Sequence, residues 1–318
     1  MQLSIFKYMF KIPDLRKRII FTLSMFAVYR LGAAVPVPGV DLDAVQRLTE
    51  SGAQAGIYGL LNLFSGGALE TFSVFALGIM PYITSSIILQ LLTVVIPRLQ
   101  KLQEEGESGR KVITQWTRYV TVVLALLQST GLTYIFSRGS LTGGISLIPN
   151  YTPSRVGLIV LTMTAGTAFI MWLGELISQR GIGNGMSLII FASIISQLPA
   201  SFGGAYQVTA GQGRIGQFSV LVLMFFLMIV GIIYVEQGQR RIPIQFAKRV
   251  RGRKVMGGQS TYIPLKVNSA GVIPVIFATS VLFFPALIAT SLPQDNRVTA
   301  GIRNWIDVNL ANSQGTSW

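Results

Sequence analysis

Long apolar runs alternate with short polar segments along the whole chain. Because a helical crossing of a bilayer needs about 20 mainly apolar residues, each run of this length is a candidate transmembrane helix. Seven runs qualify, at residues 19–37, 71–96, 113–136, 155–177, 184–202, 217–236 and 268–291. The pattern therefore predicts an all-α polytopic membrane protein.

The second apolar stretch, residues 57–96, is too long for one crossing. Gly66 and Gly67 interrupt it early, and Gly78 and Pro81 interrupt it again. Broken backbone at membrane depth is tolerated where it is buried in protein or lies beside a water-filled cavity. We therefore expect a short re-entrant helix followed by a true span.

The expected re-entrant helix covers about residues 58–64, and the span begins near Phe72. An ordinary kinked span with an amphipathic outer loop is the alternative interpretation. Within this stretch, Ile79, Ile83 and Ile87 recur every fourth residue and share one helix face. Such a stripe also suits contact with lipid or with a protein core.

The composition supports a membrane protein. Charged residues make up only 12% of the chain, against about 25% in soluble domains, and the mean hydropathy is +0.56. This charge density is too low to cover a water-exposed surface, so much of the surface must face lipid. The chain has no Cys and no His, which excludes disulfides, thiol chemistry, His-based acid–base catalysis and the usual zinc sites.

Membrane topology explains most of the net charge of +14. With the N-terminus in the cytoplasm, 18 of the 26 Lys and Arg residues fall in inner segments and six in outer segments, while Arg30 and Arg118 lie within spans. This asymmetry follows the positive-inside rule. The sequence thus predicts a cytoplasmic N-terminus.

A second glycine-rich motif links the fourth and fifth spans. Residues 171–190 contain Glu175 near the end of the fourth span and the run Gly-Ile-Gly-Asn-Gly at 181–185. These glycines permit a tight turn between two helices. The run lacks the Lys and Ser/Thr that follow in a phosphate-binding P-loop, so no nucleotide site is predicted.

Five segments, in the same order, resemble the SecY family of translocon channels in its bacterial form. FALGIMPYITSSIILQLL (75–92) and WLGELISQRGIGNGMSLII (172–190) are similar to the two signature segments of the family. FSGGALETFSVF (64–75) resembles the channel plug and its hinge, EQGQRRIPIQFAKR (236–249) the start of a long cytoplasmic loop, and PLKVNSAGVIPVIFATSVLFFP (264–285) the gate-forming seventh span. The resemblance covers essentially the whole chain.

The resemblance implies a SecY-like helix bundle with a re-entrant plug helix. About seven of the family's ten transmembrane helices would be present, and spans eight to ten would lie outside this chain. Two hinged halves would correspond to residues 1–206, with the plug at about 57–70, and to residues 207–318, with a basic cytoplasmic loop at about 238–267. No cofactor and no metal are implied.

The resemblance also implies a pore ring and a plug. Family pores are narrowed by a ring of aliphatic residues, which offer no hydrogen bonds to ions or water and resist wetting. The matching positions are Ile79, Ile83, Ile190 and Ile276. The apolar plug would block the idle pore, and the implied plug residues are Leu60, Leu61, Asn62, Phe64, Ser65, Gly66 and Gly67.

A lateral gate toward lipid would lie between spans two and three and spans seven and eight. Polar side chains within a membrane need partners, and interhelical bonds of about 1 kcal/mol are weak enough for a signal sequence to separate. Plain interhelical packing contacts are the alternative interpretation of Gln128 and Asn268. The implied gate residues are Thr84, Ile87, Gln128, Asn268, Ser280 and Phe284.

The loop from Arg240 to Lys266 carries eight positive charges. Pro243 and Gly252 limit helix formation there, so we expect an extended, hairpin-like loop. Its charge also suits anionic lipid, but the resemblance implies docking to the motor ATPase SecA and to ribosomal RNA, whose phosphates attract Lys and Arg. The implied docking residues are Arg240, Arg241, Lys248, Arg249, Arg251, Arg253 and Lys254.

The implied function is a passive protein-conducting channel in the bacterial plasma (inner) membrane, which is not an enzyme. It would pass unfolded polypeptides outward and release signal sequences and other hydrophobic segments into the lipid bilayer. Its energy would come from the ribosome or from SecA, and SecE and SecG would be its small partner subunits.

A secondary transporter for a small solute is the alternative, since transporters also use broken helices. It would need ionisable residues at the membrane midplane, whereas Arg30, Arg118, Glu175 and Glu236 lie near span ends or are isolated. An intramembrane enzyme would need a nucleophile–base pair or paired carboxylates, and the spans offer neither.

Overall fold

A computed structural model of the chain describes residues 11–41, 43–45, 62, 65–138, 147–148, 151–244, 249–251, 254–256, 261–268, 271 and 301. The chain divides into two compact units, one formed by residues 1–199 and 277–318 and the other by residues 200–276. The boundary falls directly after Pro199, inside helix α9 (Gly185–Gly211).

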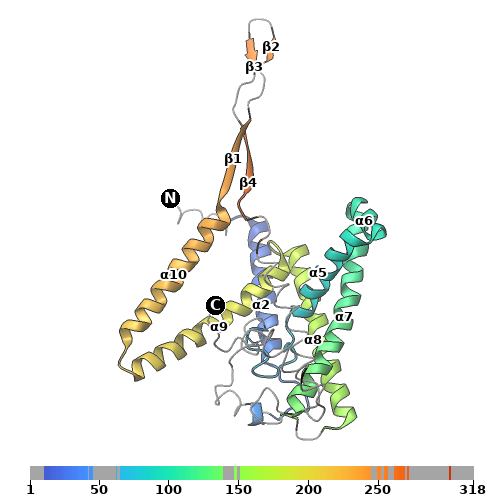
Figure 1. Ribbon diagram of the computed structural model, residues 1–318, viewed down its shortest axis with the longest axis vertical. Helices are drawn as coiled ribbons and strands as arrows, with labels where there is room; N and C mark the ends of the chain where they lie inside the picture. The colour runs from blue at the N-terminus through green and yellow to red at the C-terminus, as the bar shows by residue number, and fades with distance from the viewer. Residues whose placement is uncertain are drawn as a thin grey trace. The chain divides into compact units, whose positions relative to one another are not determined.

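The first unit is a helical bundle (Figure 1). Its helices are α2 (Pro13–Ala34), α5 (Met80–Val95), α6 (Pro97–Glu104), α7 (Glu107–Arg138), α8 (Pro153–Arg180) and the first part of α9. Proline stands in the first turn of α2, α5, α6 and α8, where its missing N–H costs no helical hydrogen bond. Helix α7 packs against α5, α6 and α8, and α2 packs against α8.

Four helices in the described part of the chain are long and apolar enough to cross a membrane, namely α7, α8, α9 and α10 (Ile215–Gln237). Helices α5 and α6 together form a fifth candidate, with a bend of 101° between them. Helix α2 has 22 residues but carries Asp14, Arg16, Lys17 and Arg18 near its start, and it does not belong to this set.

The hydropathy pattern located most of these helices correctly. The runs at 113–136, 155–177 and 217–236 are confirmed by α7, α8 and α10. The fifth run is also helical, but its predicted end at residue 202 is wrong, because α9 continues through Pro199 to Gly211. The seventh run, 268–291, lies outside the described residues except for Asn268 and Gly271.

The prediction that the second span begins near Phe72 is wrong, because the helix begins at Met80. Phe72 and Gly78 have φ angles of 46° and 56°, in the left-handed region that an α-helix cannot include. Pro81 therefore lies in the first turn of α5 and does not break a helix that began earlier. The predicted re-entrant helix at 58–64 lies outside the described residues except for Asn62.

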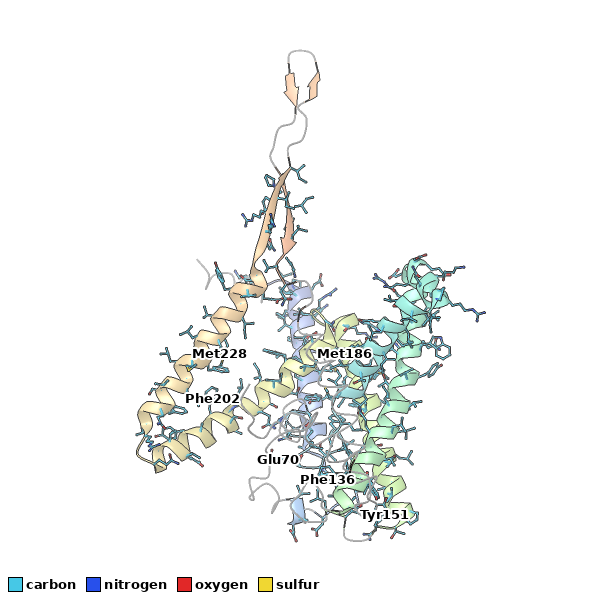
Figure 2. All side chains as sticks on the ribbon, viewed as in Figure 1. Glu70, Phe136, Tyr151, Met186, Phe202 and Met228 are labelled. Atoms are coloured by element: carbon cyan, nitrogen blue, oxygen red, sulfur yellow. The ribbon has the colours of Figure 1, made fainter. Side chains whose placement is uncertain are left out.

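The non-helical segment before α5 is held in the protein interior. Val37 N–H donates to the Phe72 carbonyl (3.0 Å) and Val74 N–H donates to the Val35 carbonyl (2.9 Å), which ties the segment to the end of α2. The Phe72 ring, only 1% exposed, meets Phe136 of α7, which Figure 2 labels, edge to face with 5.0 Å between ring centroids. Irregular backbone in a membrane protein is thus shielded by protein.

The second unit contains α10 and two short antiparallel strand pairs (Figure 1). Strand β1 (Gln239–Ile244) pairs with β4 (Thr261–Lys266), and β2 (Arg249–Arg251) pairs with β3 (Lys254–Met256). The hairpin-like loop expected from Pro243 and Gly252 is confirmed. Helix α10 has no buried residue, and its apolar side chains point outward on several sides (Figure 2).

Candidate functional site

Three of the four predicted ring residues meet in one hydrophobic cluster. Ile79 stands directly before α5 and is 2% exposed, and it belongs to a buried cluster with Ile189 of α9. Ile83 of α5 and Ile190 of α9 are partly buried and pack against that cluster. Ile276 lies outside the described residues. The ends of α5 and α9 that follow the two glycine-rich motifs therefore bring these isoleucines together.

The described part of the predicted plug is a closed loop. Asn62 Nδ2 donates to Glu70 Oε2 (3.0 Å), and Glu70 N–H donates to Asn62 Oδ1 (3.1 Å), so these two hydrogen bonds join the two ends of the loop. Inside the loop, Ser65 Oγ donates to the Asn62 carbonyl and accepts from Leu69 N–H. Leu60, Leu61 and Phe64 lie outside the described residues.

Helices α2 and α9 make hydrogen bonds to the backbone of this loop at Ser65 and Gly66. Tyr29 Oη donates to the Ser65 carbonyl (3.1 Å), and Arg30 Nη1 donates to the Gly66 carbonyl (2.9 Å) and to Ser196 Oγ (3.1 Å). A cavity of about 650 Å³ opens beside these contacts. It is lined by Ala27, Arg30, Leu31, Ala33, Ala34, Gly66, Gly67, Glu70, Thr71 and Gln197.

The predicted gate residues are distributed over both units. Thr84 and Ile87 of α5 are buried, and Thr84 Oγ1 donates to the Met80 carbonyl of its own helix (3.0 Å). Gln128 of α7 is also buried, at 5% exposure. In the second unit, Asn268 Nδ2 donates to Glu236 Oε2 (3.2 Å). The polar cluster of Thr84, Gln128 and Asn268 thus stays a prediction, and Ser280 and Phe284 lie outside the described residues.

Sequence reasoning missed an ion pair between two spans. The sequence places Arg118 and Glu175 near span ends or as isolated residues; isolation is wrong, because they form a bidentate pair between α7 and α8 with distances of 2.7 and 2.6 Å. Glu236 lies near the end of α10, as the sequence indicates, and it accepts a hydrogen bond from Asn268 Nδ2 (3.2 Å). The rule that an ionisable side chain within a membrane finds a partner could have joined Arg118 to Glu175.

A buried hydroxyl network, also missed, links α5 to α7. Ser85 Oγ of α5 lies 3.2 Å from the Thr117 carbonyl oxygen and 2.5 Å from Thr121 Oγ1, and all three residues are at most 5% exposed. Ser129 of α7 and Thr164 of α8 make a similar contact at 3.4 Å. These contacts join α5, α7 and α8 by hydrogen bonds. The mainly apolar composition of the three helices does not indicate them.

Five of the seven predicted docking residues lie on the paired strands of the second unit. Arg240 and Arg241 belong to β1, and Arg241 stacks on Tyr262 of β4 with 4.7 Å from its Cζ atom to the ring centroid. Arg249 and Arg251 lie in β2 and Lys254 in β3, where Arg251 and Lys254 are register partners. Lys248 and Arg253 lie outside the described residues. Strand pairing thus places these basic residues on two short strand pairs.

The described residues contain no group of three acidic, His or Cys side chains that could hold a metal ion. The candidate functional features are therefore an aliphatic cluster, a hydrogen-bonded loop and a basic hairpin.

Sequence comparisons place the chain beside translocase subunits. A family model described as SecY matches residues 73–313. "Protein translocase subunit SecY" of Streptomyces coelicolor is 51% identical over 99% of this chain and 72% of its own length. The subunits of the same name from Corynebacterium glutamicum and Mycobacterium tuberculosis are 51% and 48% identical, over 88% and 96% of this chain and 63% and 69% of their own lengths.

Solved structures show the same fold. A protein-conducting channel and Sec61 in the canine ribosome–channel complex from the endoplasmic reticulum each match with a TM-score of 0.59. The sequence identity is 18%, and each match covers 91% of this chain and 60% of the channel chain. The chain therefore spans less than two thirds of these solved channels, and the likeness to them establishes the fold alone.

Proposed function

Because the chain belongs to the SecY family, we propose that it forms the pore-bearing part of a protein translocase. In this function it is a passive channel through which unfolded polypeptides cross the membrane and from which hydrophobic segments leave sideways into lipid. The observation that carries the proposal is the meeting of Ile79, Ile83 and Ile190 in one cluster. An aliphatic ring can seal around varied chains, because it offers no hydrogen bonds to ions or water.

The plug and gate assignments belong to the same proposal. The loop closed by Asn62 and Glu70 is the described end of the plug. Buried Thr84, Ile87 and Gln128 form one side of the lateral gate, and Asn268, Ser280 and Phe284 belong to the other. The proposed halves are residues 1–206 and 207–318, and Ile276, outside the described residues, is the fourth proposed member of the ring.

The partners are proposed from the family and from charge. The basic hairpin docks the motor ATPase SecA and the ribosome, since a dense array of Lys and Arg binds phosphate backbones and acidic surfaces. SecE and SecG are the proposed small subunits. The proposed location is the bacterial plasma membrane with the N-terminus in the cytoplasm, supported by the distribution of Lys and Arg.

Chemical crosslinking tests the function. A photoreactive residue at Ile83 or Ile276 should react with a secretory polypeptide that is stalled in the assembled translocase. A small-solute transporter would show no such contact, and the family relationship does not favour it.

A further inference from the structure

Two neighbouring side chains of α2 hold two neighbouring carbonyls of the plug loop. Tyr29 Oη donates to the Ser65 carbonyl (3.1 Å), and Arg30 Nη1 donates to the Gly66 carbonyl (2.9 Å). Arg30 also donates to Ser196 Oγ of α9 (3.1 Å), and Ser196 Oγ itself lies 3.5 Å from the Gly66 carbonyl oxygen. Arg30 thus links α2, α9 and the loop at a single point.

The backbone conformation and the close packing at position 66 both require glycine. Gly66 has a φ of 67°, which disfavours any residue with a side chain. A Cβ atom at Gly66 would also lie 2.8 Å from Ser193 Cβ and 2.9 Å from Ser193 Cα of α9. The segment is therefore pressed between the two helices in one defined position.

The two contacts differ in how readily they can be broken. Tyr29 is 2% exposed, so its bond to Ser65 lies inside the core. Arg30 is exposed and lines the cavity of about 650 Å³, so its guanidinium can leave Gly66 without unpacking the core. A hydrogen bond from a charged donor is nevertheless stronger than a neutral one.

We propose that Arg30 is a positioning residue for the plug. This inference rests on the function proposed above. The Tyr29 bond to Ser65 stays in place when the plug moves. The Arg30 bonds to Gly66 and Ser196 hold the plug in its closed position and can break; we call these bonds the latch. Loss of the latch should let the plug leave the pore without a polypeptide substrate.

Ion leakage through the idle channel measures this latch. In vesicles that contain the complete translocase, Arg30→Met should raise leakage about tenfold, as expected for the loss of one charged hydrogen bond. Arg30→Lys keeps the charge and one donor group and should leak less than Arg30→Met. Arg155→Met, at an exposed arginine near the start of α8, should leak like the wild type.

Plug mobility separates a latch from a merely structural residue. Because the chain has no Cys, a single cysteine at Ala68→Cys, a plug position that is 0% exposed, can report the reaction rate with a membrane-impermeant thiol reagent. Arg30→Met should raise this rate about tenfold at an unchanged unfolding temperature. Ser196→Ala added to Arg30→Met should raise it no further, since the two side chains act together.

The outcomes are distinguishable. Wild-type leakage and wild-type thiol reactivity in Arg30→Met overturn the latch, while translocation of a secretory polypeptide in the same vesicles leaves the channel function standing. A lowered unfolding temperature that Arg30→Lys does not restore also overturns it, because Arg30 would then be structural. If the wild-type translocase moves no polypeptide, the proposed function itself fails.

Discussion

Arg118 of α7 and Glu175 of α8 face each other as a two-point ion pair. Arg118 Nε lies 2.7 Å from Glu175 Oε1, and Arg118 Nη2 lies 2.6 Å from Glu175 Oε2. The Glu175 side chain is only 16% exposed, whereas that of Arg118 is 45% exposed. The planar guanidinium therefore links α7 to α8 through two charged hydrogen bonds, which add geometric specificity to the contact.

Removal of Arg118 should destabilise the protein, because it leaves the mostly buried Glu175 carboxylate without its partner. We expect Arg118→Met to lower the free energy of unfolding by about 1–2 kcal/mol, less than for a fully buried pair, because Arg118 is partly exposed. Denaturation of the purified protein in detergent measures this change. Arg155→Met is the matched control, and the double variant Arg118→Met/Glu175→Gln should recover part of the loss. Equal stability of Arg118→Met and the wild type would contradict the prediction.

Two glycines of α8 should respond in opposite ways to the same substitution. A Cβ atom at Gly166 would lie 2.0 Å from the Val74 carbonyl oxygen of the segment before α5, whereas nothing lies within 4 Å of one at Gly157. Gly166→Ala should therefore cost about 2 kcal/mol of unfolding free energy through overpacking against backbone. Gly157→Ala should gain about 0.5 kcal/mol, since alanine favours the helix.

Thermal unfolding in detergent compares the two variants directly. A stabilised Gly166→Ala protein would contradict the close approach of α8 to the segment at Val74.

The sequence predicts the regular helices well because membrane burial imposes length and composition on each of them. Helices α7, α8 and α10 follow from apolar runs alone. The hairpin follows from Pro243 and Gly252, which disfavour helix. For the site, the motif around Ile79 and Ile83 and the motif before Ile190 identify residues that do meet.

The remaining features depend on tertiary contacts between distant residues. The left-handed backbone at Phe72 is stabilised by hydrogen bonds from Val37 and to Val35, which the local sequence does not reveal. The Arg118–Glu175 pair joins two residues that are 57 positions apart in the sequence. Pro199 looks like a helix end, yet α9 continues past it. At Phe72, contacts with distant residues override the local preference.

The basic hairpin should bind its cytoplasmic partners through charge. We expect Arg241→Glu and Arg251→Glu each to weaken binding of the motor ATPase or ribosome about tenfold, with a reduced dependence of affinity on salt concentration. Cosedimentation of translocase vesicles with the partner at several salt concentrations measures the effect. Arg155→Glu, on the predicted outer side, should bind like the wild type.

Arg241→Lys refines this test. Lysine keeps the charge but stacks less well on the Tyr262 ring that Arg241 covers at 4.7 Å. Unchanged binding by both charge-reversal variants would exclude the hairpin as the docking site.

The central claim is that Ile79, Ile83 and Ile190 line the path of a translocating polypeptide. It is tested most directly by placing a photoreactive residue at Ile83 in the assembled translocase and stalling a secretory polypeptide part-way across the membrane. The account predicts a strong crosslink from Ile83 to the polypeptide and none from a photoreactive residue at Leu161, which is 66% exposed on the outside of α8. No crosslink from Ile83, or an equal one from Leu161, would contradict it.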